Sequence, residues 1–163
     1  MCGICGVIRL DDAPVTIGTL KVMNERMVSR GPDDEGYYVS KNFGMAMRRL
    51  SVIDLHTGKQ PISNTQETVI VVMNGEIYNY IELRSELEKK GHIFRTNSDT
   101  EVLVHLYEEH GTDSVRFLNG MFAFALWDGN KKRLWLVRDR IGIKPLVFFK
   151  NDKLFAFAST MDA

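Results

Sequence analysis

Apolar positions along the chain predict strands toward both ends and helices in the middle. The run Ile4–Leu10 is apolar and β-branched, which is typical of a buried strand, and apolar residues three or four apart over Ile17–Met27 predict a helix. Further strands are predicted, in chain order, at Tyr37–Val39, Met45–Ile53, Val69–Met73, Met121–Trp127, Leu134–Val137, Leu146–Phe149 and Leu154–Ala158. Short polar turns join the last four strands into two antiparallel hairpins.

Two more helices are predicted in the central block, each with its own start signal. Asn79 followed by Glu82 resembles a capping arrangement, and Ser98 followed by Glu101 forms a full capping box. Asp99 would then lie in the first turn of the second helix, where the helix dipole favours a carboxylate. The stretch 56–64 is rich in turn residues and is predicted to be a loop.

The order of these elements predicts an α+β fold. Strands joined by short turns form mainly antiparallel sheets, and the helices are segregated to the outer faces. Several strands are apolar on both faces, so each sheet has to be covered twice. Two sheets stacked face to face with helices outside satisfy this requirement, which gives four layers.

Composition narrows the class of protein. The chain has 163 residues, 44% hydrophobic and 26% charged, which fits one globular domain. The 21 basic residues balance the 21 acidic ones, and this zero net charge disfavours nucleic-acid binding. It also leaves little electrostatic repulsion between copies of the chain, so it is compatible with a homo-oligomer. No apolar run approaches a membrane span and no basic segment marks a signal peptide. We expect a cytoplasmic protein with neither membrane nor nucleic acid as partner.

Cys2 is the most informative single residue. Removal of Met1, which is usual before a small residue, leaves Cys2 with an α-amine beside its thiol, a nucleophile with a built-in base. An α-amine titrates at about 7.7–8.0, close to the working pH of a general base. On position alone, however, a small buried residue at the start of a strand is the favoured alternative.

The C-x-x-C spacing of Cys2 and Cys5 also occurs in redox and zinc sites. A redox pair normally opens a helix, whereas a strand follows here. His105 and His110 could complete a zinc set by residue type, but they lie far along the chain on one predicted helix. Alternation along a strand places the two cysteines on opposite faces, so Cys5 is predicted to be in the core and no metal site is expected.

Asn74 and Gly75 follow an apolar strand and allow two interpretations. A hairpin turn is one, but the chain continues toward a helix instead of a second strand. An oxyanion hole is the other, with the Asn74 amide and the Gly75 backbone N–H converging on one oxygen. Arg49 and Asp99, taken singly, are explained by a solvated surface and by the helix dipole.

Seven motifs favour the functional interpretation of these residues over the structural one, because they occur together and in order. They are MCGICG at 1–6, RGPDDEG at 30–36, RRLSVIDL at 48–55, NGEIYNY at 74–80, SDTEVL at 98–103, GMFAFALWD at 120–128 and RDRIGIKPL at 138–146. Over essentially the whole chain they resemble the glutaminase domain of asparagine synthetase, a class II glutamine amidotransferase with an N-terminal nucleophile. The resemblance implies the αββα sandwich of N-terminal nucleophile hydrolases, in agreement with the four layers above, and one type 2 glutamine amidotransferase domain over residues 1–163.

The resemblance also implies a role for individual residues. The implied site consists of Cys2 as nucleophile, Asn74 and Gly75 as oxyanion hole, Arg49 for the α-carboxylate of glutamine, Glu76 and Asp99 for its α-ammonium group, and the backbone of Val52 and Ile53 as pocket wall. Arg48, a second arginine beside Arg49, is expected on the opposite face of its strand.

The implied reaction is hydrolysis of the side-chain amide of glutamine through a cysteinyl thioester, which gives glutamate and ammonia for a synthetase domain or partner. No cofactor is implied for this domain, since ATP and Mg²⁺ would belong to the synthetase. Neither a P-loop nor the Ser-Gly-Gly-x-Asp-Ser signature of that synthetase occurs, so we expect the chain alone not to make asparagine. A fragment of a longer protein is favoured over a stand-alone subunit, and residues 141–149 and the last strand are expected to expose apolar surface to the synthetase.

Two other functions remain open. One is a catalytically silent domain that senses glutamine or binds partners, and the other is an N-terminal nucleophile hydrolase of a different amide. The presence of all the implied catalytic groups argues against a silent domain. The combination of Arg49 and Asp99 favours an amino-acid head group over other amides.

Overall fold

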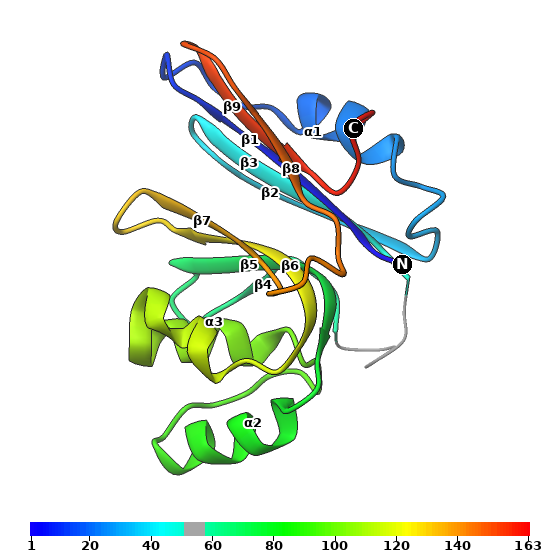
Figure 1. The fold of residues 1–163 in the computed structure, drawn as a ribbon. Coiled ribbons are helices and arrows are strands. Elements are labelled where there is room, and N and C mark those ends of the chain that lie inside the picture. Colours follow the sequence, from blue (N-terminus) through cyan, green and yellow to red (C-terminus); the bar gives the residue numbers. More distant parts are fainter. Residues whose placement is uncertain (51–57) are drawn as a thin grey trace.

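The computed structural model describes residues 1–50 and 58–163, whose elements stack in four layers (Figure 1). In chain order these are β1 (Gly3–Arg9), α1 (Ile17–Glu25), β2 (Asp34–Ser40), β3 (Phe43–Arg49), β4 (Ile62–Ser63), β5 (Val69–Ile77), α2 (Tyr80–Lys89), α3 (Glu101–His110), the 3₁₀ helix η1 (Gly111–Phe117), β6 (Gly120–Asp128), β7 (Arg133–Arg138), β8 (Val147–Lys150) and β9 (Leu154–Ala158). Among the described residues, no helix has the length and apolar character needed to cross a membrane.

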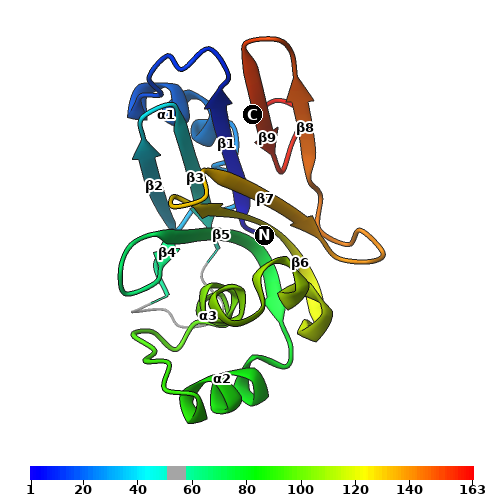
Figure 2. The ribbon, with the colours of Figure 1, turned by 90° about the vertical axis from the view of Figure 1, so that its left-hand side faces the viewer.

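Two antiparallel sheets form the middle layers. One has the strand order β2-β3-β1-β9-β8 and the other β4-β5-β6-β7. Helix α1 covers the outer face of the first sheet, and α3 with α2 covers the outer face of the second (Figures 1 and 2). The predicted α+β fold with four αββα layers is therefore confirmed.

Apolar side chains fill the space between the two sheets. Ile4 and Met45 of the first sheet meet Val72 and Trp127 of the second in one cluster. The Trp127 ring stacks on Phe43 with ring centroids 4.1 Å apart. Since the strands of both sheets are also apolar on their outer faces, each sheet needs a helical cover as well.

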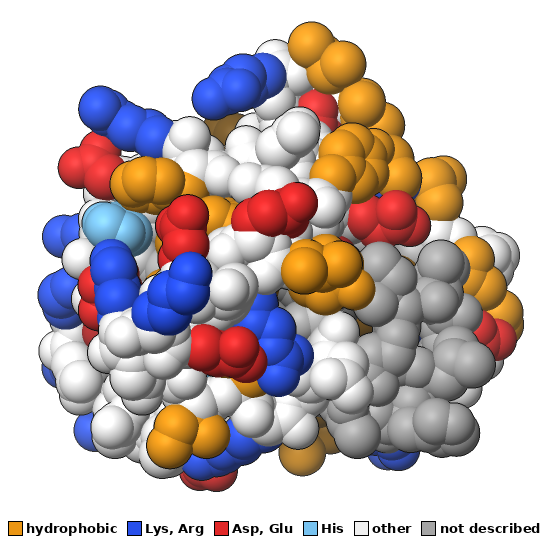
Figure 3. Space-filling view, turned by 90° about the horizontal axis from the view of Figure 1, so that it is seen from below, with side chains coloured by type: hydrophobic (Ala, Val, Ile, Leu, Met, Phe, Trp, Pro, Cys, Tyr) orange, Lys and Arg blue, Asp and Glu red, His pale blue; other side chains and the backbone are white. Residues whose placement is uncertain are grey.

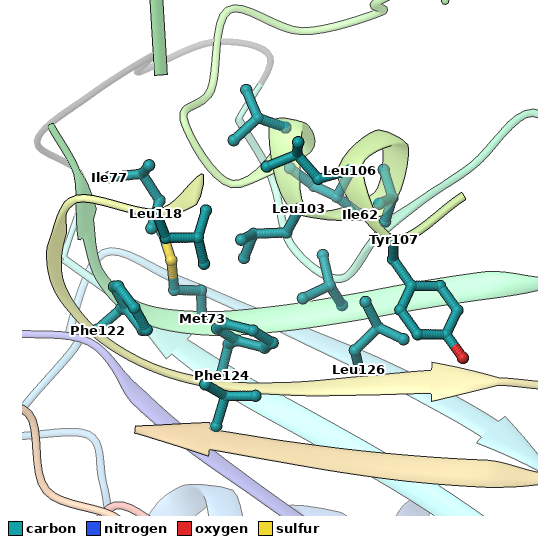
Figure 4. Packing of buried hydrophobic residues seen from close by; sticks show 14 of the residues in the cluster. Ile62, Met73, Ile77, Leu103, Leu106, Tyr107, Leu118, Phe122, Phe124 and Leu126 are labelled. Carbon is teal, nitrogen blue, oxygen red and sulfur yellow. The ribbon is translucent and has the colours of Figure 1, made fainter. Parts of the chain in front are cut away.

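Helix α3 packs on the outer face of the second sheet. Figure 4 shows Met73, Phe124 and Leu126 of this sheet directed toward Leu103 and Leu106 of the helix. Every α3 residue from 101 to 107 is buried, because α2 and the segment between the two helices cover the other side of α3. The start of α3 is therefore held in place beside the end of β5.

A buried hydrogen bond ties α3 to the sheet. The Tyr107 hydroxyl donates to Asp128 Oδ2 at 2.9 Å, and both side chains are buried. Burial and the neighbouring Asp128 carboxylate raise the pKa of Tyr107 to about 12.

We expect Tyr107→Phe to lower the free energy of unfolding by roughly 1–3 kcal/mol at pH 7, because the buried carboxylate loses a donor. A folded pKa above the ordinary value of 10 means that this stabilisation is complete below pH 10 and is lost as the pH rises through about 12. Denaturant unfolding of the parent and the variant at pH 7 measures the loss of stability, and the same measurement between pH 10 and about pH 12 measures its dependence on the ionisation of Tyr107. A constant difference in stability across that range would contradict the titration.

The end of β5 differs from the prediction. The strand expected to stop at Met73 continues to Ile77, because β6 pairs with it residue by residue, with Asn74 opposite Ala123. Strand β3 ends at Arg49, one residue before the described part of the chain breaks off, and residues 51–53 of the predicted strand lie outside that part. The predicted loop over 56–64 contains β4, and its residues 56 and 57 lie outside the described part of the chain.

Both capping predictions are wrong. The Asn79 side chain donates to the carbonyl of Phe117 and accepts from the N–H of Asn119, so it binds the chain after η1 and does not cap α2. Helix α3 begins at Glu101, and the Glu101 carboxylate accepts the backbone N–H groups of residues 95 and 96 in place of that of Ser98. Asp99 therefore precedes the helix and does not lie in its first turn.

Candidate active site

A cavity of about 130 Å³ lies where the N-terminus, the end of β3, the second half of β5 and the segment before α3 meet. The predicted site residues that line it are Cys2, Arg49, Asn74, Gly75, Glu76 and Asp99. The other two, Val52 and Ile53, lie outside the described residues. The structure thus brings together six side chains or backbone positions from four separate segments.

The Cys2 thiol lies at the start of β1 and is partly exposed. Its Sγ is 3.6 Å from the carbonyl oxygen of Leu50, and its own carbonyl accepts a hydrogen bond from Arg30 Nε at 3.0 Å. Met1 is exposed and lines the cavity next to it. Removal of Met1 would therefore leave the α-amine of Cys2 at the cavity.

Cys5 has a different environment. It is fully buried on the face of β1 that packs under α1, whereas Cys2 packs against the cluster between the sheets. Burial raises the pKa of the Cys5 thiol to about 12, against a smaller lowering by a backbone hydrogen bond with Ala46. Cys5 is thus a neutral core residue, as predicted, and of the two thiols Cys2 alone faces the cavity.

Asn74 provides a buried donor at the cavity. The residue is 1% exposed, and its Nδ2 has no hydrogen-bond partner among the described residues. A buried amide nitrogen without a partner is unfavourable by about 1–3 kcal/mol, so the site can satisfy it with a ligand oxygen. This is the arrangement that an oxyanion hole requires before substrate binds.

Gly75 has to be glycine for two independent reasons. Its φ is +154°, a conformation that other residues rarely adopt, and a Cβ at this position would lie 2.2 Å from the carbonyl oxygen of Met121. The chain therefore approaches β6 closely and leaves the backbone of Gly75 uncovered at the cavity.

The two adjacent arginines point in different directions, as the alternation of a strand predicts. Arg49 is buried and lines the cavity, whereas Arg48 Nη2 pairs with Glu35 Oε2 at 2.8 Å on the other face. A buried guanidinium at a cavity wall is a fork-shaped donor suited to a carboxylate.

Asp99 and Glu76 place negative charge on the cavity wall. Burial raises the pKa of Asp99, backbone N–H groups of Ile77 and Thr100 lower it, and the charge of Glu76 raises it again, with a net upward shift. Asp99 Oδ2 accepts the Ile77 N–H at 2.8 Å, which fixes the carboxylate at the end of β5. A cationic group bound here would relieve the unfavourable ionisation of Asp99.

Three polar residues of the cavity were missed from the sequence. Gln60 links the start of α3 to β5, since its Nε2 donates to Thr100 Oγ1 and its Oε1 accepts the Met73 N–H. Ser98 and Lys144 also line the cavity. Lys144 lies within the RDRIGIKPL motif at 138–146, which was the available signal, but that motif assigned it no role.

Chemically, the cavity combines a thiol, a buried amide donor, a guanidinium, an ammonium and two carboxylates. The described residues that line it include no histidine. The α-amine that removal of Met1 would leave on Cys2 lies beside the thiol and is a candidate base for it. These groups suit acyl transfer from a small zwitterionic amide.

Comparison with known proteins gives consistent results. A family model described as "Glutamine amidotransferase domain" matches residues 1–163. Asparagine synthetase [glutamine-hydrolyzing] 2 of Bacillus subtilis (strain 168) is 48% identical over 162 residues, which cover 96% of this chain and 21% of that protein. Asparagine synthetase [glutamine-hydrolyzing] 2 of Arabidopsis thaliana is 43% identical over 165 residues, which cover 100% of this chain and 28% of that protein. The chain thus spans about a quarter of the length of these curated relatives.

A solved structure supports the fold independently. Glutamine phosphoribosylpyrophosphate amidotransferase from B. subtilis, complexed with ADP and GMP, matches with a TM-score of 0.78 over 97% of this chain and 42% of that chain. The sequence identity is 21%, so this match concerns the fold alone.

Proposed function

This chain belongs to the family of glutamine amidotransferase domains, and we propose that it hydrolyses the side-chain amide of glutamine through a thioester on Cys2, releasing ammonia for a synthetase. The observation that carries the proposal is the unpartnered Nδ2 of buried Asn74 in the same cavity as the Cys2 thiol. A nucleophile and a preorganised donor for a developing oxyanion are the two parts that amide cleavage needs most.

The protein first has to lose Met1, which frees the α-amine of Cys2. The α-amine of Cys2, directly or through a water, takes the thiol proton, and the thiolate attacks the side-chain carbonyl carbon of glutamine. Asn74 Nδ2 and the Gly75 N–H donate to the tetrahedral oxyanion, each contributing about 3–4 kcal/mol in comparable sites. The C–N bond breaks, and ammonia leaves with the proton returned by the amine. Water then hydrolyses the glutamyl thioester and regenerates the thiol.

The head group of glutamine is held by opposite charges. The Arg49 guanidinium pairs with the α-carboxylate, and Asp99 with Glu76 accepts the α-ammonium group. The backbone of Val52 and Ile53 is proposed to complete the pocket. Fixing both ends of the amino-acid portion positions the side-chain amide at the thiol and rejects amides without this head group.

Replacement of Asp99 tests the head-group assignment. We expect Asp99→Asn to raise KM for glutamine by about 10–100-fold, with a smaller effect on kcat. This factor corresponds to the loss of one hydrogen bond between charged groups. Because burial raises the pKa of Asp99, its ionisation opposes folding at neutral pH, so the variant should have a higher Tm than the parent. Steady-state kinetics and thermal unfolding measure the two effects, and an unchanged KM would remove Asp99 from the binding site.

We further propose that the ammonia serves asparagine formation. The curated relatives are named as glutamine-hydrolysing asparagine synthetases and are about four times as long, so a synthetase domain or subunit would use the ammonia together with ATP and Mg²⁺ in the cytoplasm. Exposed apolar side chains on the loop before β8 and on β8 itself, namely Ile141, Ile143, Phe148 and Phe149, would face that synthetase. No cofactor is proposed for the glutaminase reaction itself.

An assay of glutamate release tests the proposed function. The preparation has its N-terminus confirmed by mass spectrometry, and glutamine is compared with 4-aminobutanamide, which keeps the amide and the amine but has no α-carboxylate. We expect hydrolysis of glutamine and a loss of at least about tenfold in kcat/KM for the analogue, since the analogue has no α-carboxylate for Arg49 to bind. Glutamine turnover no faster than that of Cys2→Ala would refute the proposal, and equal turnover of both amides would refute the head-group assignment.

A further inference from the structure

A second group of potential ligand side chains lies in the helical layers, outside the cavity of the candidate active site. His92 belongs to the segment between α2 and α3, and His105 and Glu108 lie one turn apart on α3. None of the three falls in the seven motifs, and the proposed reaction uses none of them. The face of the molecule on the side of α2 and α3 carries interspersed acidic and basic side chains (Figure 3).

Three ligand atoms converge within this cluster. His92 Nδ1 is 3.1 Å from His105 Nδ1 and 3.5 Å from Glu108 Oε2, and His105 Nδ1 is 3.2 Å from the same oxygen. A tetrahedral ion about 2.0–2.1 Å from each ligand requires ligand atoms about 3.3–3.4 Å apart. The triangle therefore has the size that such an ion needs, with one coordination position left for water.

The outer nitrogens of both histidines face carboxylates. His92 Nε2 lies 3.1 Å from Glu109 Oε1, and His105 Nε2 lies 3.7 Å from Glu101 Oε1. The contact of His92 Nε2 with Glu109 favours the proton on that nitrogen and a lone pair at Nδ1, which is the pattern that supports histidine ligands of metals. His105 Nε2 is buried and has no hydrogen-bond partner among the described residues. The two Nδ1 atoms and one carboxylate oxygen lie within 3.5 Å of one another, and this arrangement requires a cation or a proton between them.

The carboxylate ligand is also held in place. Glu108 Oε1 accepts a hydrogen bond from Asn64 Nδ2 at 2.8 Å, and Asn64 is itself buried and bonded to the backbone of residues 68 and 69. The side chains of His92 and Glu108 are 15% and 27% exposed, whereas that of His105 is 4% exposed, so solvent reaches the cluster from one side. The site is thus oriented in advance and accessible to an ion.

We propose that His92, His105 and Glu108 bind one divalent transition-metal ion, for which Zn²⁺ is the best match to two imidazoles and a carboxylate at this spacing. The bound ion joins the segment between α2 and α3 to α3 itself. This segment ends at Ser98 and Asp99 on the cavity wall, so the ion stabilises the part of the fold that carries them.

A shared proton is the competing explanation. One protonated imidazole could bridge the same atoms without any metal, and metal titration separates the two explanations. The Cys2 thiol would compete for zinc, so the measurement uses the Cys2→Ala chain, freed of metal with a chelator. We expect calorimetry to show one Zn²⁺ per chain, thermal unfolding to show a rise in Tm, and X-ray absorption to show nitrogen and oxygen ligands at about 2.0–2.1 Å without sulfur at about 2.3 Å.

Three variants in the same background locate the site. His92→Ala and Glu108→Gln should each weaken Zn²⁺ binding by more than about tenfold and reduce the zinc-dependent rise in Tm. His110→Ala is the matched control, since His110 lies on α3 but packs against Phe117, and it should bind like the parent. Absence of zinc binding by the Cys2→Ala chain, sulfur in its absorption spectrum, or full affinity in either His92→Ala or Glu108→Gln would overturn the proposal.

Discussion

Replacing Cys2 by alanine is expected to reduce glutamate release from glutamine by more than about 10⁴-fold while the fold remains intact. The thioester has no other possible attachment point, because the second thiol, Cys5, is buried under α1 on the other face of β1. The Cys2 side chain is only partly buried, alanine keeps its Cβ, and among the described residues its Sγ makes a 3.6 Å contact with the Leu50 carbonyl. Its removal should therefore change the free energy of unfolding by less than about 1 kcal/mol.

Cys5→Ala is the matched control, and it should change stability instead of activity. We expect it to destabilise the protein by roughly 1–2 kcal/mol through lost packing while kcat stays at the parent value. Glutaminase assays and denaturant unfolding of both variants decide the assignment. A loss of less than about 10⁴-fold in Cys2→Ala, or loss of activity in Cys5→Ala without unfolding, would show that the wrong thiol has been assigned.

The state of Met1 gives an independent check on the base. If Met1 is retained, the nitrogen of Cys2 is an amide and cannot accept the thiol proton, so the chain should be inactive although its thiol can still be alkylated. Specific activity should therefore rise in proportion to the fraction of chains that mass spectrometry finds without Met1. High activity in a preparation that fully retains Met1 would exclude the α-amine as base.

The layers of this fold could be predicted because they follow from local pattern. Strands such as β1, with Ile4 on one face and Cys5 on the other both buried, can exist only inside a stack of layers. The positions where elements end could not be predicted in the same way. Strand β5 continues through Asn74, Gly75 and Glu76 because β6, far along the chain, supplies the hydrogen-bonding partner.

The capping errors have a related cause. Ser98 and Glu101 have the spacing of a capping box, but the Glu101 carboxylate has stronger competing donors in the backbone of residues 95 and 96. Asn79 is likewise drawn to the chain after η1. Local motifs describe what a side chain can bond, and tertiary packing decides among the available partners.

The candidate site also combines features that the sequence predicts with features that depend on tertiary packing. The resemblance carried by the ordered motifs was sufficient to predict that Cys2, Arg49, Asn74 and Asp99 share one site, and all four line the same cavity. Four of the seven motifs carry one of these residues each. Lys144 reaches the same cavity because its loop folds back against Asp139, which accepts the Lys144 N–H. No spacing along the chain predicts such a return. The sequence analysis considered His105 as a zinc ligand only together with the cysteines and expected no metal site, because the approach of His92 and Glu108 to His105 depends on how two segments pack.

Asn74→Ala is expected to lower kcat for glutamine by about 100–1,000-fold, equivalent to about 2.7–4 kcal/mol of transition-state stabilisation, with KM nearly unchanged. The reason is that Asn74 Nδ2, which has no hydrogen-bond partner among the described residues, is proposed to donate to the oxyanion of the transition state. A loss confined to kcat distinguishes this role from substrate binding, which would appear in KM.

Asn24→Ala is a matched control for the loss of a buried asparagine. Asn24 is fully buried, and its Nδ2 bonds the Tyr37 hydroxyl and the Met47 carbonyl, none of which lines the cavity. We expect it to lower the free energy of unfolding by about 1–3 kcal/mol and to leave kcat unchanged, because its truncation leaves buried groups unpaired. Removing Asn74 should affect stability less, since its Nδ2 leaves no partner behind. If Asn74→Ala instead unfolds easily and its residual folded fraction turns over at the parent rate, the unpartnered amide is a structural defect and the oxyanion has another donor.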